Sequence, residues 1–278
     1  MPLLRRFDAR CTPAIWRRRL DDPAYREYLD AEVRLPMQLA PCNAPTGGFM
    51  QKATARLDSA GLVLRLGERL REQGLLITDD VRHEDIRPGA RDVAWRGLTA
   101  ERLIFCEGHR LRFNPWFRWL PLQPAKGEIL TLDTARALPG HILNAGRWLI
   151  PLEDGRARFG ATHAWDPIDE IATPGGRREL LADLGERFPS LADARVLAQH
   201  AGVRPGTPDR QPFVGLHPTL PCLGVFNGFG AKGAMLIPRH ARHFARVLDG
   251  SAPPTPRADI ARFGLHFDDY PQTPDETL

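Results

Sequence analysis

The stretch CLGVFNGFGAKGAMLIPRHA, residues 222–241, decides how the rest of the chain is interpreted. It contains a literal G-x-G-x-x-G at Gly228, Gly230 and Gly233, with an apolar run before it and helix-forming residues after it. A dinucleotide fingerprint also needs a second strand that ends in an acidic residue about 20 positions further on. Asp249 lies at that distance, but it ends the expected helix and a proline-rich run follows it. The stretch therefore predicts a strand, a glycine loop and a helix, without the dinucleotide unit.

A glycine loop that opens a helix leaves backbone N–H groups at the positive end of the helix dipole. Such a loop can hold an anion, or an oxygen that becomes anionic during a reaction. The missing Cβ atoms also let a flat ring approach the backbone closely. The alternative is a turn that serves only tight packing of the helix on a sheet, and this stretch alone leaves both interpretations open.

Composition is that of an ordinary globular protein, with 278 residues, 42% hydrophobic and 26% charged. The formal charge is +4, but the arginines alternate with acidic residues, as in residues 17–32. That pattern is typical of solvated helix faces and argues against nucleic acid as a partner. No apolar run is long enough to span a membrane and no signal peptide is recognisable, so the sequence predicts no membrane association and a cytoplasmic location.

Cysteines and histidines give no sign of a metal site. The four cysteines form no C-x-x-C pair, which excludes a zinc knuckle or a dithiol redox motif. His240 and His243 are three positions apart on an expected helix, with no third ligand in view. We therefore expect surface histidines and no bound metal.

Periodicity and turn signals predict a mixed α/β (α+β) fold. A run of antiparallel strands is flanked by helix–strand pieces, which suggests two lobes that share a discontinuous chain. Asp154-Gly155 is a strong signal for a hairpin turn. We expect helices over residues 12–34, 57–74 and 173–189, and strands over residues 75–81, 101–108, 127–132, 141–145 and 147–163.

Upstream of the glycine loop, the segment HAGVRPGTPDRQPFVGLHP (200–218) is rich in proline and glycine and predicts a rigid, repeatedly turned connection. Stiff backbone around Arg204 would restrict where its guanidinium points, as bidentate recognition of a carboxylate requires. The alternative is a structural ion pair between Arg204 and Asp209.

Together, AGVRPGTPDRQPFVG (201–215) and GVFNGFGAKGAMLIPRHA (224–241) resemble the C-terminal signature of flavin-dependent oxidases of the D-amino-acid oxidase and glycine oxidase superfamily. The resemblance runs over most of residues 50–262. It includes LIFCEG (103–108), similar to the strand and glycine beside the flavin, and PLQPAKGEILTL (121–132), similar to the Lys-Gly-Glu segment that leads into the substrate-domain sheet. RWLIPLEDGRARFGATHAWD resembles the hairpin that follows.

The resemblance implies a lobe organisation of the oxidase type. Residues 50–112 and 200–262 would form an incomplete FAD-binding lobe. Residues 1–49 and 113–199 would form an antiparallel-sheet, substrate-binding lobe, and residues 263–278 a C-terminal tail.

The same resemblance implies the chemistry. The cofactor would be FAD and the substrate a small amine or amino acid, oxidised by hydride transfer from its α-carbon to flavin N5. Arg204 would be the catalytic-site residue that binds the substrate carboxylate. Ala231 stands where glycine oxidases carry a further arginine, which leaves the substrate open. The residues that would contact the flavin are Gly108, Gly228, Phe229, Gly230, Ala231, Lys232 and Gly233.

One departure from the family concerns the start of the chain. No strand–G-x-G-x-x-G–helix unit can be recognised in residues 1–56, where the family anchors the FAD phosphates. The resemblance therefore implies a member that lacks its N-terminal portion and holds FAD poorly. Two alternatives stay open: a non-catalytic remnant or interaction module of the same fold, and the oxidase lobe of a tRNA-modifying enzyme.

Overall fold

A computed structural model describes residues 1–35, 37 and 40–270. The chain divides into two compact units, one made of Met1–Leu57 with Lys126–Gly202 and the other of Asp58–Ala125 with Val203–Leu278. Two of the crossings between units fall within strands, β8 (Gln123–Asp133) and β12 (Arg195–Gly206). The mixed α/β architecture agrees with the predicted fold class. The assignment of FAD binding to one lobe and substrate binding to the other stays a prediction.

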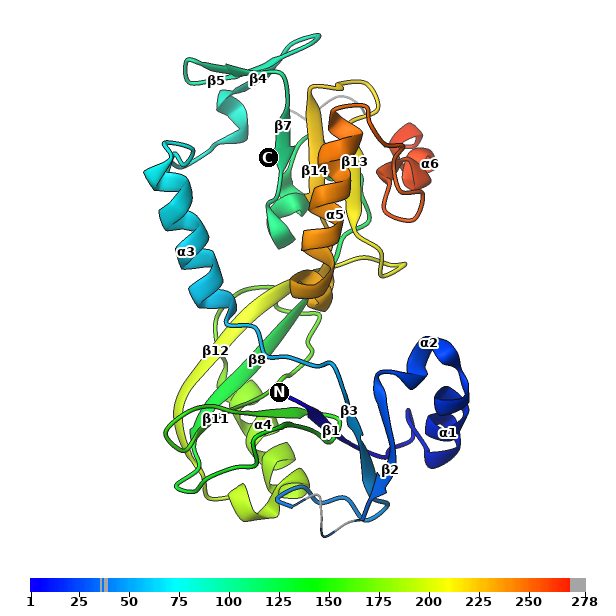
Figure 1. Ribbon diagram of the computed structural model, residues 1–278. Helices are drawn as coiled ribbons and strands as arrows, with labels where there is room; N and C mark the ends of the chain where they lie inside the picture. The colour runs from blue at the N-terminus through cyan, green and yellow to red at the C-terminus, as the bar shows by residue number, and fades with distance from the viewer. Residues whose placement is uncertain (36, 38–39, 271–278) are drawn as a thin grey trace. The chain divides into compact units, whose positions relative to one another are not determined.

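The first unit is built on an eight-stranded sheet, in the order β12-β8-β11-β10-β9-β1-β3-β2 (Figure 1). The predicted meander is confirmed, because β8, β11, β10 and β9 pair antiparallel in succession. Asp154 (φ 58°) and Gly155 (φ 68°) form the predicted hairpin turn between β10 and β11, with the left-handed backbone that such a turn demands. The remaining strands are β1 (Leu3–Arg6), β2 (Leu29–Arg34), β3 (Gly48–Gln51), β9 (Ile142–Asn144), β10 (Trp148–Pro151) and β11 (Arg156–Gly160).

The expected helix over residues 12–34 is only partly correct. The structure has α1 (Pro13–Asp21), capped by Thr12 as predicted, and a short α2 (Pro23–Arg26) that restarts on an Asp22 cap. The chain then becomes strand β2, because extension lets Leu29 enter the cluster formed by Phe7, Trp16 and Phe49. Pairing with β3 therefore overrides the local helical pattern.

Lys126 and Glu128 show how the first unit holds its longest helix, α4 (Pro174–Arg187). The buried Glu128 carboxylate accepts hydrogen bonds from the backbone N–H and the hydroxyl of Thr173, both at 2.8 Å. Thr173 is the N-cap of α4, so the negative charge lies at the positive end of that helix. Lys126, also buried, is neutralised by Asp169 at 2.5 Å.

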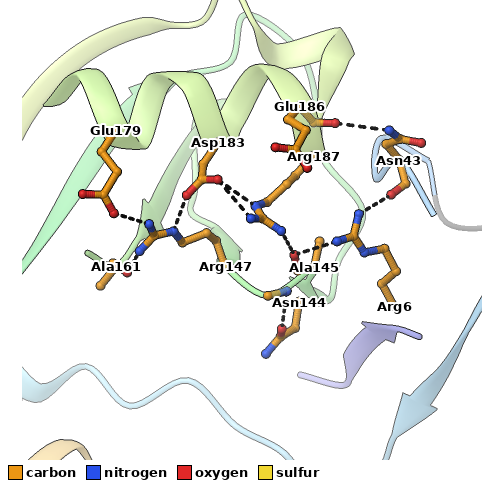
Figure 2. Close-up of polar contacts among 11 residues, drawn as sticks. Arg6, Asn43, Asn144, Ala145, Arg147, Ala161, Glu179, Asp183, Glu186 and Arg187 are labelled. Carbon is orange, nitrogen blue, oxygen red and sulfur yellow. Dashed lines mark hydrogen bonds and ion pairs between the residues drawn. The ribbon is translucent and has the colours of Figure 1, made fainter. Parts of the chain in front are cut away.

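An arginine network fastens α4 to the strands beneath it (Figure 2). Asp183 accepts a hydrogen bond from Arg147 at 2.6 Å and forms an ion pair with Arg187 at 3.0 Å. Arg147 also pairs with Glu179 and donates to the carbonyl of Ala161. Asp183 thus joins two guanidinium groups. Burial by itself would raise its pKa, but the hydrogen bonds from Arg147 and Arg187 lower the pKa of Asp183 below its ordinary value.

We predict that Asp183→Asn destabilises the protein by about 2 kcal/mol near neutral pH, since it removes a charge that accepts several hydrogen bonds. Because the pKa of Asp183 is lower in the folded state, its carboxylate stabilises the fold above the ordinary carboxyl pKa of about 4. This stabilisation is lost as the pH falls through the pKa of the folded state. The difference in free energy of unfolding should therefore shrink on acidification from about pH 7 to below about pH 4. Urea unfolding at both ends of that range measures it. Exposed Asp193 gives the control variant, Asp193→Asn. If the loss in free energy of unfolding caused by Asp183→Asn does not change with pH, the ionised Asp183 does not stabilise the fold as described.

The second unit is built on a smaller sheet in the order β13-β14-β7, in which β14 and β7 are parallel. Helix α5 packs on β13 and β14 through the cluster that contains Val214, Phe229 and Phe244 (Figure 1). A separate three-stranded sheet, β4-β5-β6, contributes Ile86 and Val93 to the main core of this unit. The bounds are β4 (Ile86–Pro88), β5 (Val93–Trp95), β6 (Leu98–Ala100), β7 (Leu103–Phe105), β13 (Phe213–Leu216), β14 (Leu223–Asn227) and α5 (Gly233–Leu248).

Helix α3 (Ser59–Glu72) confirms the prediction over residues 57–74, but none of its side chains is buried. In Figure 1 it stands away from the β13–β14–β7 sheet. The strand predicted at residues 75–81 is wrong: the segment joins no described sheet, and Leu75 and Ile77 are exposed, so packing does not stabilise an extended form. Among the described residues, no helix is long and apolar enough to cross a bilayer.

Residues 200–218 are only partly the turned connection that their prolines suggested, because the turn is confined to residues 207–212. Residues up to Gly206 belong to β12, and β13 begins at Phe213. Pro205 is tolerated because β12 is an end strand of its sheet, where a missing N–H costs little. Of the predicted tail 263–278, the structure shows α6 (Gly264–Asp268), and residues 271–278 lie outside the described part.

Candidate functional site

The glycine loop between β14 and α5 has a backbone that only glycine adopts easily. Gly228 has φ +76° and Gly230 has φ +52°, both in the left-handed region. The buried Asn227 holds the start of the loop. Its side-chain Oδ1 accepts a hydrogen bond from the N–H of Gly228 at 2.7 Å, and its side-chain Nδ2 donates one to the backbone carbonyl of Gly108 at 3.0 Å. One side chain therefore ties the predicted Gly108 to the predicted loop.

The loop lies directly against the segment that follows Arg204. A Cβ on Gly228 would come within 2.7 Å of the Thr207 side chain and 3.1 Å of the backbone nitrogen of Phe213. A Cβ on Gly230 would lie 3.8 Å from the Cα of Gly206. The two sequence segments that carried the resemblance are thus in contact within the second unit.

The residues after Gly230 lead into α5 without a capping side chain. Gly230–Lys232 form a single 3-10 turn, and α5 then begins at Gly233 with no capping side chain at Lys232. The first N–H groups of a helix have no partner within the helix and favour negative charge. Ala231 and Lys232 are exposed, whereas Phe229 is buried in the cluster under α5 and serves packing.

Arg204 is half-buried in β12. Burial lowers its pKa from the ordinary value, but a guanidinium titrates so far above neutrality that Arg204 stays cationic. The Asp209 carboxylate, which the sequence offered as its structural partner, binds Arg262 instead at 2.7 Å. Burial by itself would raise the pKa of Asp209, but hydrogen bonds from Arg262 and from the backbone of Gln211 lower it below its ordinary value. Sheet pairing of β12, rather than a series of turns, positions Arg204.

Sequence reasoning missed a polar cluster beside Gly108. His83 lies 2.6 Å from Glu107, and the other oxygen of Glu107 accepts from the amide of Asn114 at 2.8 Å. Asn114, fully buried, in turn accepts from the backbone of Trp116 and Phe117. The cluster orders the turn that starts at Gly108 (φ +58°). Its members are scattered from residue 83 to 117, so no local motif announces it.

The geometry fits one end of a flavin better than the other. A flat ring with a polarised carbonyl edge could lie against the glycine backbone, where no Cβ atoms intervene. The N-terminus of α5, which lacks a capping side chain, and the half-buried Arg204 also suit such a ring. The described residues include no second strand–glycine turn–helix unit of the kind that cradles a pyrophosphate. Residues that could hold the ring are therefore present in the described part of the chain, and a dinucleotide anchor is not among them.

Comparison with known proteins agrees with this geometry. A sequence profile described as FAD dependent oxidoreductase matches residues 2–247. Glycine oxidase from Pseudomonas aeruginosa is 35% identical over 147 residues, which cover 51% of this chain and 40% of that protein. The tRNA 5-methylaminomethyl-2-thiouridine biosynthesis bifunctional protein MnmC of Aromatoleum aromaticum is 28% identical over 57% of this chain and 28% of that protein. The crystal structure of iminodiacetate oxidase from a Chelativorans species has a TM-score of 0.76 at 22% identity, covering 93% of this chain and 74% of that one.

The chain therefore belongs to the FAD dependent oxidoreductase family, as the resemblance implied. The cofactor of this family is FAD, and the structural neighbour shows that the fold is the flavoenzyme fold. The match spans about 40% of the length of the glycine oxidase. The roles of Arg204 and of the loop residues stay predictions.

We predict that Gly228→Ala destabilises the protein by at least about 2 kcal/mol, because the new Cβ adds a clash with Thr207 and Phe213 to a left-handed backbone. Gly230→Ala should cost only about 1 kcal/mol, since its Cβ meets nothing closer than 3.8 Å. Chemical denaturation of both variants measures the difference. Equal losses would mean that the loop is not packed against the Thr207 segment as described.

Proposed function

We propose that this chain forms the ring-binding and substrate-binding part of an FAD-dependent oxidoreductase that oxidises the C–N bond of a small amine or amino acid. One observation carries the proposal. The Gly228–Gly233 loop, which leads directly into the uncapped start of α5, lies against Pro205 and Gly206, the residues that follow Arg204 on β12, within one unit. Family membership supports the cofactor and the reaction class.

At the cofactor end, the chain contributes backbone rather than side chains. Gly108 and Gly228–Gly233 would lie against the ring, where the missing Cβ atoms allow close approach and the N–H groups at the start of α5 stabilise negative charge on it. Lys232, exposed beside them, could add positive charge at longer range. When bound, the flavin supplies the two-electron acceptor that none of the amino-acid side chains provides.

At the substrate end, Arg204 would bind the carboxylate of an amino acid through a bidentate fork. Its half-buried position weakens competition from water, and its place on a paired strand limits the directions that the guanidinium can take. Such positioning holds the substrate α-carbon in a fixed orientation, which can supply a large part of a rate enhancement. No dedicated general base is required of the chain for this chemistry.

We predict that Arg204→Lys in the flavin-loaded enzyme lowers kcat/KM for an amino-acid substrate by about a hundredfold, because a point charge cannot reproduce two parallel hydrogen bonds. The loss for an amine without a carboxylate should stay within about threefold. Rates of anaerobic flavin bleaching measure both.

Arg262→Lys serves as the matched control, because Arg262 is an arginine of the same unit whose partner, Asp209, is known. It should affect both substrates equally. If Arg204→Lys lowers kcat/KM equally for both substrates, Arg204 stabilises the fold and does not bind the substrate carboxylate. No bleaching with any amine or amino acid would favour the non-catalytic module instead.

A second prediction concerns the 278-residue protein itself. If the described residues bind only the ring end, riboflavin and FAD should bind with dissociation constants within about threefold of each other, because the ADP portion gains no contacts. Gly230→Ala should weaken the binding of both riboflavin and FAD by more than the loss in folding stability of this variant explains. Quenching of flavin fluorescence on titration measures these constants. FAD binding that is tighter by about a hundredfold or more would reveal a pyrophosphate site that the described geometry does not show.

A further inference from the structure

The outward face of α5 forms one wall of a large basic groove in the second unit. The groove has a volume of about 830 Å³, and a segment around residue 255 forms its other wall. No aspartate or glutamate lines it. Its charged and titratable lining residues are Arg239, His240, Arg242, His243, Arg246 and Arg257.

None of these four arginines forms an ion pair among the residues that the structure describes, although Asp249 lies within range of the charge of Arg246. Arg246 donates to the carbonyl of Ser251 at 3.5 Å. Asp249, which follows α5, accepts from the backbone of Ser251 at 2.8 Å; hydrogen bonds from Ser251, together with the charge of Arg246, lower the pKa of Asp249. A concave surface lined by charges of one sign focuses the electrostatic potential and attracts polyanions.

The groove is held open by specific contacts and is not a gap beside a loose loop. His243 hydrogen-bonds to the carbonyl of Pro253 at 3.0 Å, which fixes the second wall to α5. The carbonyl of Thr255 accepts from Ala258 at 2.9 Å, and Ala258 in turn accepts from Val214 of β13 at 2.9 Å. Arg257 lies inside this fixed turn.

The spacing of the arginines along α5 suits a row of anions better than a single anion. Arg239, Arg242 and Arg246 are three and four positions apart, so they share one face of α5 and extend over about 10 Å. A lone phosphate needs only one or two guanidinium forks. The groove contains arginine and no lysine, and guanidinium planes stack on bases as well as bind phosphates. Exposed Met235 and Pro238 add an apolar surface at one end, on which an unstacked base could pack.

We propose that this groove binds the phosphodiester backbone of a single-stranded nucleic acid. The arginines of α5 would contact successive phosphates, and Arg257 would close on the strand from the opposite wall. The proposal is independent of the flavin chemistry, because the arginines of the groove lie from Arg239 onward on α5 and the ring site would use the N–H groups at the start of the helix. The alternation of acids and bases that argued against nucleic acid for the whole chain does not extend to α5, which contains no acidic residue.

The test is fluorescence anisotropy with a labelled single-stranded RNA of about 12 nucleotides, titrated at several salt concentrations. The groove variant combines Arg239→Gln, Arg242→Gln and Arg246→Gln. The control combines Arg65→Gln, Arg69→Gln and Arg71→Gln on α3, which removes the same charge from exposed positions of another helix in the same unit. Glutamine is a good helix former, and thermal melts followed by circular dichroism verify both folds.

The groove variant should lose at least about tenfold in affinity, and its slope of log K against log salt should fall by about 2 to 3, as expected for three lost phosphate contacts. The α3 variant should change affinity by less than about twofold. A DNA strand of the same sequence identifies the polymer, and binding of either one supports the proposal. Equal losses in both variants, no RNA binding by the wild-type protein, or equal affinity for polyglutamate would overturn it. Flavin binding should be the same in the groove variant and the wild type, so failure here is distinguishable from failure of the proposed function.

Discussion

The left-handed turn at Gly228 is the constraint on which the candidate site depends. A side chain there would collide with Thr207 and with the backbone of Phe213, so only glycine lets β14 end this close to the segment after β12. That contact brings the glycine loop against the segment that directly follows Arg204. Asn227 extends the same constraint to Gly108 through two short hydrogen bonds. Several elements distant in sequence are thus positioned by one backbone conformation.

Local sequence signals were reliable where local physics decides the structure. Thr12 and Thr173 cap helices, Asp154-Gly155 makes its hairpin turn, and the glycine stretch forms a loop between a strand and a helix. The local signals failed where pairing with a distant strand decides the secondary structure of a segment. Residues 29–34 look helical but complete a sheet beside β3, and residues up to Gly206 look turned but form an end strand that tolerates Pro205. The His83–Glu107–Asn114 cluster depends on contacts between distant residues, which no local motif encodes.

Helix α5 joins two different electrostatic features. Its first turn offers N–H groups without a capping side chain next to the glycine loop, and its outward face carries three arginines that form no ion pair in the described part of the chain. Its inward face packs through Phe244 and Val247 on the sheet, so the helix position is set by the core and not by either ligand. The two surfaces can therefore be altered separately by mutation.

The central claim is that the Gly228–Gly233 loop and Arg204 form a site for the flavin ring. A crystal structure of the protein soaked with FAD at saturating concentration tests it most directly. The account predicts the isoalloxazine ring in van der Waals contact with the backbone of Gly228 and Gly230, its carbonyl edge toward the N–H groups at the start of α5, and the Arg204 guanidinium facing the ring. A ring bound elsewhere, or a loop that shifts to fill this space with Phe229, would contradict the claim.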